Sequence, residues 1–241
     1  MISEEMLSIW GIKRNNDYFE LYYNGKKLKF FYGNDPLGVL IRLIEQFIMQ
    51  VYKPLRIQGR HVVDVGSYIC DSSIFFAVNG AKHVYAFEPF KKAYDLGLKN
   101  VIVNGLSDKV SVYNVALYDS NCKVKIDGGT FSSYAELREV KEGIEVQALT
   151  IVDMLNLIKS KEIILKVDCE GCERFLLKYG EALRSFYQIF IEFDYRYKEI
   201  FKLLKNMGYK VKVFNIRRVN DRLTGNLLAL RYYTEPPSCL L

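Results

Sequence analysis

The sequence predicts an α/β fold built on a doubly wound, mostly parallel β-sheet. From His61 onward, short β-branched runs alternate with segments of helical periodicity, which is typical of parallel strands joined by crossover helices. The last two predicted strands have only a loop between them, so we expect an antiparallel hairpin at one edge of the sheet.

Composition supports a globular protein and leaves its partner open. Of the 241 residues, 50% are hydrophobic and 26% are charged, which excludes a disordered chain. The net charge of +6 permits an anionic partner without requiring one. The densest basic group consists of Arg217, Arg218 and Arg222, and it is sparse for an RNA-binding surface.

The N-terminal part predicts a hairpin followed by a helix. Aromatic and apolar runs flank the turn signal Asn24-Gly25 within residues 18–33. An amphipathic helix begins at Pro36 and runs toward Tyr52, and the charges of Arg42 and Glu45 interrupt it, so it does not predict a membrane span. We expect residues 1–57 to form an extension packed on a main domain of residues 58–241.

The first ten residues carry two acids and no apolar signal core, and the five cysteines are an odd number. A secreted disulfide framework is therefore not expected, and the prediction is a cytoplasmic protein.

The main domain contains seven predicted strands and four predicted helices. The strands are residues 61–66, 83–88, 110–117, 162–168, 188–194, 209–216 and 226–233. The helices are residues 71–79, 90–104, 151–159 and 197–207, and glycines follow three of them. Residues 119–149 are less regular, with a hairpin predicted around Lys123 to Ile126 and a polar segment, 127–143, that could cover an acceptor.

A cofactor site is predicted where the first two strands end. Gly66 permits a tight turn after the first strand, and Ser67 and Tyr68 lie in that turn. Glu88 ends the second strand 22 positions after Gly66, where an acid accepts hydrogen bonds from an adenosine ribose. Ser72, at the next helix N-terminus, and Pro89, directly after Glu88, complete the predicted contacts.

The sequence of the turn after the first strand favours S-adenosylmethionine over a nicotinamide dinucleotide as the cofactor. A dinucleotide fingerprint needs three small residues, whereas Gly66 to Asp71 reads Gly-Ser-Tyr-Ile-Cys-Asp with a single glycine. A pyrophosphate would meet Tyr68, so a cofactor without phosphates fits better.

The stretch "KVDCEGCER" supplies the candidate acids. Asp168 ends the fourth strand, next to the expected sulfonium of the cofactor, and a carboxylate there can position an acceptor hydroxyl or take its proton. Glu170 is the second candidate, and Glu192, in the fifth strand, is the third. Glu173 falls in the first turn of a helix and is equally explained as a cap.

The Cys-x-x-Cys pair in that stretch does not predict a metal or redox site. Acids next to Cys169 and Cys172 raise a thiol pKa and work against a reactive thiolate. A structural zinc needs two further ligands, and the only histidines are His61 and His83, beside predicted strands. We expect small, half-buried cysteines and no metal.

Three segments, "VVDVGSYICDSSIFFAVNGAKHVYAFEP", "NGLSDKVSVYNVAL" and "LKVDCEGCE", together resemble the FkbM-type methyltransferases, a class I S-adenosylmethionine-dependent family. The resemblance spans about residues 61–192. It implies a Rossmann-like seven-stranded sheet that ends in the antiparallel hairpin, and O-methylation, often of sugar or natural-product hydroxyls.

The resemblance also assigns residues. Its loop motif falls on Asp64, Gly66, Ser67 and Tyr68, its ribose acid on Glu88, and its adenine contacts on Val115 and Ala116. Its acidic motif falls on Lys166, Asp168, Glu170, Gly171 and Glu173. This chain departs from the pattern at Cys70, which stands where the family has a second loop glycine; its Cβ is expected to narrow the cofactor pocket.

The expected function is O-methylation of a sugar, a glycan or another small hydroxylated molecule. One alternative is an RNA methyltransferase, suggested by the basic charge and the three arginines named above. Another is a non-catalytic nucleotide-binding module, suggested by Cys70.

Overall fold

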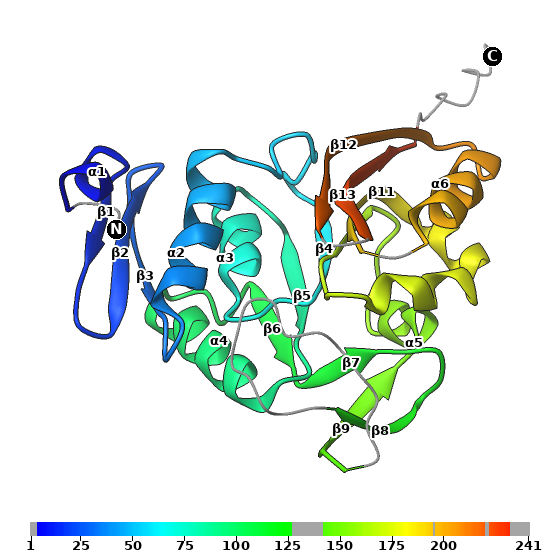
Figure 1. The fold of residues 1–241 in the computed structure, drawn as a ribbon, viewed down its shortest axis with the longest axis horizontal. Helices are drawn as coiled ribbons and strands as arrows, with labels where there is room; N and C mark the ends of the chain where they lie inside the picture. The colour runs from blue at the N-terminus through cyan, green and yellow to red at the C-terminus, as the bar shows by residue number, and fades with distance from the viewer. Residues whose placement is uncertain (1–3, 127–141, 195, 220–221, 232–241) are drawn as a thin grey trace, which may run out of the picture.

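A seven-stranded sheet forms the centre of the computed structural model, which describes residues 4–126, 142–194, 196–219 and 222–231 (Figure 1). Its strand order is β12-β13-β11-β10-β4-β5-β6. These strands are β4 (His61–Val65), β5 (His83–Phe87), β6 (Val110–Tyr113), β10 (Ile163–Val167), β11 (Phe186–Phe193), β12 (Lys210–Val219) and β13 (Arg222–Leu230). Strands β11, β10, β4, β5 and β6 pair in parallel, and β13 and β12 pair antiparallel at the edge, which confirms the predicted fold class.

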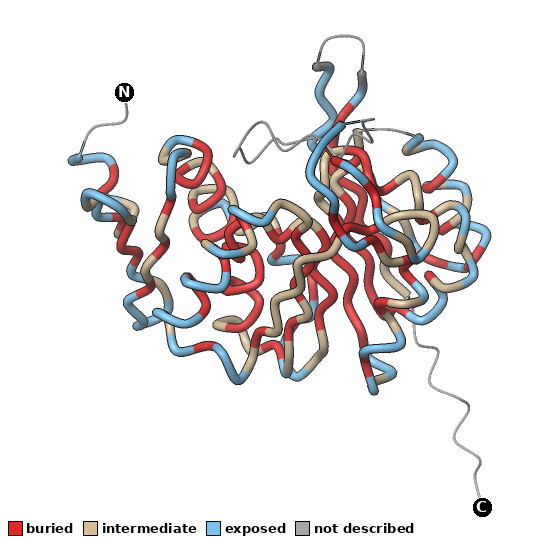
Figure 2. The backbone as a smooth tube through the Cα atoms, turned by 90° about the horizontal axis from the view of Figure 1, so that it is seen from below, coloured by how far each residue is buried: buried red, intermediate tan, exposed pale blue. Residues whose placement is uncertain are grey.

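Helices cover both faces of this sheet. On one face lie α3 (Asp71–Val78) and α4 (Lys91–Val103), and on the other lie α5 (Ile151–Asn156) and α6 (Tyr197–Asn206) (Figure 1). Two 3-10 helices, η2 (Cys172–Leu177) and η3 (Gly180–Ser185), connect β10 to β11. Neighbouring residues of β4 alternate between the faces, since Val62 belongs to the cluster of α3 and Val63 to that of α5. A sheet covered on both faces has the buried strands seen in Figure 2.

The N-terminal segment forms a small sheet and a helix that pack on α3 and α4. It contains α1 (Glu4–Ile9), β1 (Ile12–Arg14), β2 (Tyr18–Tyr23), β3 (Lys26–Phe31), α2 (Pro36–Leu43) and the π-helical turn η1 (Ile44–Ile48). The predicted hairpin is confirmed, with Asn24 and Gly25 in left-handed conformation between β2 and β3. The side-chain amide oxygens of Asn100 in α4 and of Asn104, directly after α4, accept from the backbone N–H groups of Phe31 and Lys29, respectively. The edge of β3 is thereby paired and held to the main domain.

One predicted strand is wrong as a single element. Residues 110–117 divide at Asn114 into β6 and β7 (Val115–Leu117), because the Asn114 amide donates to the carbonyl oxygens of Glu88 and Pro89. Strand β7 is not part of the central sheet and pairs in parallel with β9 (Ile144–Leu149), in a third sheet of order β7-β9-β8.

The hairpin predicted around Lys123 to Ile126 is present as β8 (Cys122–Ile126), antiparallel to β9. Most of the polar segment 127–143 lies outside the described residues.

Smaller differences concern where elements end. Helix α5 ends at Asn156 rather than near 159, and the C-terminal hairpin is longer than predicted, since β12 continues to Val219. Within the part of the chain that the structure describes, no helix is long and apolar enough to cross a membrane.

Candidate active site

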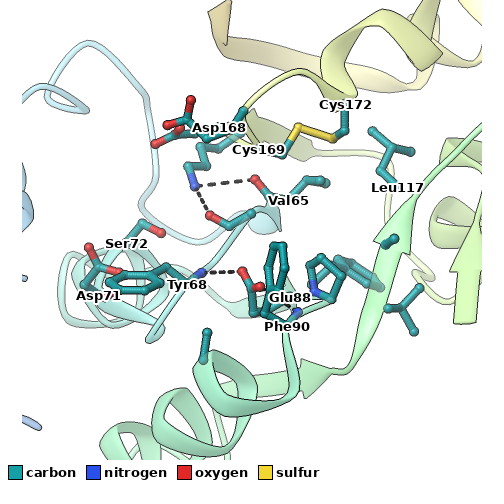
Figure 3. A pocket seen from close by; sticks show the side chains of 18 of the residues that line it. Val65, Tyr68, Asp71, Ser72, Glu88, Phe90, Leu117, Asp168, Cys169 and Cys172 are labelled. Carbon is teal, nitrogen blue, oxygen red and sulfur yellow. Dashed lines mark hydrogen bonds between the residues drawn. A yellow bond between two sulfur atoms is a disulfide. The ribbon is translucent and has the colours of Figure 1, made fainter. Parts of the chain in front are cut away.

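A pocket of about 750 Å³, with the solvent at its mouth included, opens at the carboxyl ends of β4, β5 and β10 (Figure 3). This is the end of a doubly wound sheet at which ligands bind. The predicted residues that line it are Gly66, Tyr68, Ser72, Glu88, Pro89, Val115, Ala116, Asp168 and Glu170. Figure 3 shows Glu88 and Asp168 at separate walls of the pocket, with Val65 between them.

Gly66 brings the ends of two neighbouring strands into contact. Its φ of +74° is left-handed, and a Cβ at this position would lie 1.8 Å from the carbonyl oxygen of Asp168. A side chain therefore cannot be accommodated without moving the loop that carries Asp168. Tyr68, two residues later, also has a positive φ.

Glu88 closes the turn as well as facing the pocket. Its carboxylate accepts hydrogen bonds from the backbone N–H groups of Tyr68 and Phe90, both at 2.9 Å. Only 5% of Glu88 is exposed, and this burial raises its pKa to about 7. An acid held in this way can accept from a ribose hydroxyl with its remaining lone pairs.

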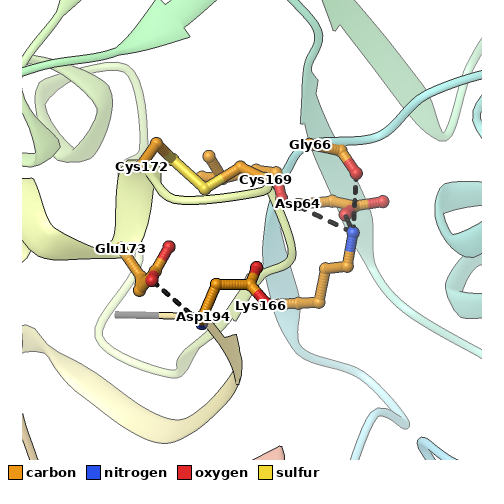
Figure 4. Close-up of a disulfide and its surroundings, with 8 residues drawn as sticks. Asp64, Gly66, Lys166, Cys169, Cys172, Glu173 and Asp194 are labelled. Carbon is orange, nitrogen blue, oxygen red and sulfur yellow. Dashed lines mark hydrogen bonds and ion pairs between the residues drawn. A yellow bond between two sulfur atoms is a disulfide. The ribbon is translucent and has the colours of Figure 1, made fainter. Parts of the chain in front are cut away.

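Asp64 and Ser67 do not reach the pocket, although both were predicted as cofactor contacts. Both are fully buried. Asp64 pairs with Lys166 at 2.9 Å and accepts from the hydroxyls of Ser72 and Ser73, so its carboxylate is turned into the protein (Figure 4). The position predicted to touch the cofactor instead supports the loop from beneath. Ser72 lines the pocket, but its hydroxyl is donated to Asp64.

Lys166 ties this support to the loop. Its side chain is 2% exposed, and its ammonium group donates to the carbonyl oxygen of Gly66 at 2.8 Å (Figure 4). The lysine thus links the first strand-end loop to β10, and a buried ion pair with added hydrogen bonds of this kind fixes geometry.

The three candidate acids meet around one arginine. Asp168 lies 3.7 Å, Glu170 3.7 Å and Glu192 3.9 Å from the guanidinium of Arg42, which is 9% exposed. Burial, with the charge of Asp168 added, raises the pKa of Glu170 to about 9 and that of Glu192 to about 8. Of the three, Asp168 and Glu170 line the pocket, and Glu192 does not.

Sequence reasoning missed several lining residues, and Arg42 and Gln46 are the most informative. Both lie on the helical stretch from Pro36, far from the recognised motifs. A charged residue on the apolar face of an amphipathic helix was the available signal, because such a residue needs a buried partner. The other missed residues are the apolar wall residues Val65, Phe87, Phe90, Ala93 and Leu117, and Asp71, Lys166, Cys169 and Cys172.

The prediction of two separate half-buried cysteines is wrong. Cys169 and Cys172 form a disulfide, with their Cα atoms 5.5 Å apart, and both line the pocket (Figure 4). The intervening Glu170 and Gly171 are left-handed, with φ of 49° and 108°, and this turn returns the chain toward Cys169. Within the described residues, no cluster of His, Cys, Asp or Glu side chains is arranged to hold a metal ion.

Glu173 is more than an exposed cap. It lies in the first turn of η2 but is fully buried, and it accepts from the backbone N–H of Asp194 at 3.1 Å (Figure 4). The contact joins the loop after β10 to the loop after β11.

Cys70 does not narrow the pocket, contrary to expectation. It is left-handed, with φ of 62°, and fully buried, and its thiol points toward Gly97 of α4 rather than into the pocket. A Cβ at Gly97 would lie 2.7 Å from the Cys70 sulfur, so the absence of a side chain on α4 makes room for the thiol.

Three solved structures are similar to this chain at low identity. The precorrin-6y C5,15-methyltransferase of Geobacter metallireducens shares 12% identity over 74% of this chain and 84% of its own, with a TM-score of 0.45. A candidate tRNA (m1A22) methyltransferase of Streptococcus pneumoniae, in complex with S-adenosyl-L-methionine, shares 16% identity over 76% and 72%, with a TM-score of 0.46. The precorrin 8w decarboxylase of Methanobacterium thermoautotrophicum shares 14% identity over 82% of this chain and 92% of its own, with a TM-score of 0.46. At these values they carry no conclusion about substrate or cofactor.

No curated protein sequence matches the chain. The family model of the methyltransferase FkbM domain matches residues 64–211, a region that includes the Gly66 turn, Glu88 and the acidic motif. The match spans more than half of the sequence, and the chain therefore belongs to the FkbM methyltransferase domain family.

Proposed function

We propose that this protein transfers a methyl group from S-adenosylmethionine to a hydroxyl group of a sugar, a glycan or another small molecule. The observation that carries the proposal is the arrangement of one pocket. Glu88 and an apolar wall line part of it, and Asp168 and Glu170 line another part.

The pocket residues fit S-adenosylmethionine. Phe87, Val115 and Ala116 give an apolar wall for an adenine, and Glu88 offers a buried carboxylate for the ribose hydroxyls. Gln46 also lines the pocket, and its buried side-chain oxygen has no hydrogen-bond partner among the described residues. That oxygen suits a donor such as the amino group of the cofactor.

The acids fit the acceptor side. When bound, S-adenosylmethionine supplies a methyl group on a positively charged sulfur, and negative side chains nearby stabilise that charge. Burial raises the pKa of Glu170 to about 9, so this pocket residue holds a proton at neutral pH and can donate a hydrogen bond to an acceptor. Glu192, whose pKa is raised to about 8, adds to the acidic group around Arg42. Asp168 is then the residue placed to orient the acceptor hydroxyl and to receive its proton.

Ligand-dependent thermal unfolding tests the cofactor. S-adenosylhomocysteine at about 100 times its dissociation constant should stabilise the protein by roughly 2.7 kcal/mol, whereas NAD at equal concentration should not. For a chain of this size the unfolding midpoint should rise by roughly 5–10 °C. A shift with NAD alone, or no shift with either, would contradict the proposal.

Methyl transfer itself is tested with a panel of hydroxylated acceptors. Incubation with S-adenosylmethionine and simple sugars, glycosides and phenols should give a product with one added methyl group by mass spectrometry. Ligand binding without turnover on any acceptor would favour the alternative of a non-catalytic nucleotide-binding module. The original reason for that alternative is weaker, because Cys70 points away from the pocket.

The RNA alternative has less support from side-chain geometry. Arg217 is 3.3 Å from Glu192 and donates to Thr224 at 3.2 Å, so part of its charge is already paired. Salt-dependent retention of RNA in a filter assay would nevertheless favour RNA as the acceptor.

A further inference from the structure

We infer that Arg42, on helix α2, is a positioning residue for the acids that face the methyl acceptor. The inference rests on the proposed function, because it assigns Arg42 a part in that same site. Helix α2 precedes residues 64–211, which the family model matches, so family membership assigns no role to Arg42.

The guanidinium faces four carboxylates from three parts of the chain. Of these four, Glu45 in the adjoining η1 turn is the nearest, at 3.3 Å. Across the site it faces Asp168, Glu170 and Glu192 at 3.7–3.9 Å. Glu45 thus anchors the cation from its own side, and the three candidate acids share it from the other.

The three acids repel one another once they ionise, and a shared cation offsets that repulsion. The charge of Asp168 raises the pKa of both Glu170 and Glu192, and the charge of Arg42 lowers both. Like charges in one buried site cannot all be ionised unless an opposite charge compensates for them. Arg42 therefore holds together side chains that come from the ends of β10 and β11.

The remaining charges around this group are accounted for. Asp194 adds to the negative field at Glu170, Glu45 does so at Glu192, and Asp71 acts on Arg42 itself. Arg217 offsets part of the field at Glu192, to which it lies 3.3 Å away. Among the ion pairs of the described residues, Arg42 is the cation that lies within reach of all three acids.

Arginine suits this task because it does not lose its proton at any pH that a protein tolerates. Its charge stays fixed while the acids exchange protons. When an acceptor hydroxyl gives its proton to Asp168, the oxygen forms its bond to the methyl carbon and the electron pair of the carbon–sulfur bond remains on sulfur. The guanidinium keeps the carboxylate that receives the proton in place.

The first test is a titration of the side-chain carboxyl groups by ¹³C NMR in the cofactor-free protein. Arg42→Met should raise the titration midpoints of Glu170 and Glu192 by roughly one to two pH units, as expected for loss of a neighbouring cation. Arg42→Lys should restore most of the wild-type behaviour. Arg60→Met is the matched control, since Arg60, directly before β4, pairs with Glu162 at 3.3 Å and does not line the pocket.

The second test uses two cofactor analogues. Sinefungin carries an amine where S-adenosylmethionine carries its methyl group, so its preference over S-adenosylhomocysteine reports the negative charge beside the methyl position. Calorimetry gives the ratio of the two dissociation constants, and in the wild type the preference for sinefungin should increase as the acids ionise with rising pH. In Arg42→Met the same increase should occur at a pH that is higher by roughly one to two units. Arg60→Met should leave the pH dependence of this preference unchanged.

The outcomes separate the two claims. Carboxyl titrations that Arg42→Met leaves unmoved would overturn the role of Arg42, whatever the cofactor. A wild-type protein that binds neither analogue would overturn the proposed function, while the titration would still decide whether Arg42 couples to the acids. If Arg42→Met does not fold, Arg42→Gln, which is neutral but keeps hydrogen-bond donors, takes its place in both measurements.

Discussion

At the scale of single residues, the site depends on buried polar groups that each serve two neighbours. Glu88 joins the Gly66 turn to the chain after β5 and also faces the pocket. Lys166 pairs with Asp64 and holds the carbonyl oxygen of Gly66. Removal of one such group leaves its partner unsatisfied, which costs more than the lost hydrogen bond alone.

Replacement of Glu88 by glutamine should weaken cofactor binding. The glutamine amide would place a donor where the carboxylate accepts from backbone N–H groups and from a ribose. The loss of a charge-assisted hydrogen bond of about 1.5–3 kcal/mol predicts a dissociation constant for S-adenosylhomocysteine that rises about 10- to 100-fold. Calorimetry measures this, with Glu181→Gln, an exposed acid, as control. If the wild type and Glu88→Gln bound S-adenosylhomocysteine with equal affinity, the proposed contact between Glu88 and the cofactor would be wrong.

Replacement of Gly66 by alanine should destabilise the fold far more than the same change at Gly105. Both glycines are left-handed, with φ of 74° and 65°, so both alanines carry the left-handed cost of about 1–2 kcal/mol. Only at Gly66 would the Cβ meet a neighbour, the Asp168 carbonyl oxygen, and nothing lies within 4 Å of a Cβ at Gly105. Denaturant unfolding compares the two variants. If both variants lost the same amount of stability, the loop that carries Asp168 could move away from position 66 at little cost.

At the scale of elements, three interactions hold the loop after β10 in place. The Gly66 turn packs against Asp168, the Glu173 carboxylate accepts from Asp194, and the Cys169–Cys172 disulfide closes the turn between Asp168 and η2. The loop carries Asp168 and Glu170, so each of these interactions helps to position the candidate acids.

Reduction of the disulfide should lower stability modestly. A cross-link that closes a loop of about four residues restricts the unfolded chain by roughly 2 kcal/mol. A dithiol reductant should therefore lower the unfolding midpoint of the wild type by about 4–8 °C. It should have no effect on a protein in which both Cys169 and Cys172 are replaced by serine. The buried Cys70 thiol remains in that variant as an internal control.

At the scale of the whole molecule, the folded protein holds protons that the unfolded chain would release. Burial raises the pKa of Glu88 to about 7, that of Glu192 to about 8 and that of Glu170 to about 9, from ordinary values near 4.5. These acids favour the protonated form in the folded state, because burial penalises their charged form.

The free energy of unfolding should consequently fall as pH rises. Between about pH 4.5 and 9 the folded state binds more protons than the unfolded chain, so each rise in pH within this window favours unfolding, and the effect ends above the highest folded pKa. Denaturant unfolding at about pH 5, 7 and 9 measures the trend. A variant with glutamine at Glu170 and Glu192 should show a smaller fall, and a trend parallel to that of the wild type would contradict the assignment.

The central sheet could be predicted from the sequence because its information is local. Buried parallel strands need continuous apolar runs, their helices need a periodic face, and glycines mark where helices end. The turn at Asn24-Gly25 and the C-terminal hairpin followed from short-range signals of the same kind. The division at Asn114 did not, since it depends on two carbonyl groups that only the fold brings near.

By itself the sequence determined the α/β sheet, the Gly66 turn, and the placement of Glu88 and Asp168 at strand ends, because strand polarity fixes which residues reach that edge. The tertiary structure alone decided which of the predicted residues face the pocket. It turned Asp64 inward to Lys166, paired Cys169 with Cys172, and carried Arg42 from a distant helix into the acidic group. Each of these contacts joins residues whose partner is set by packing and charge neutralisation in three dimensions, and spacing along the chain does not encode such partners.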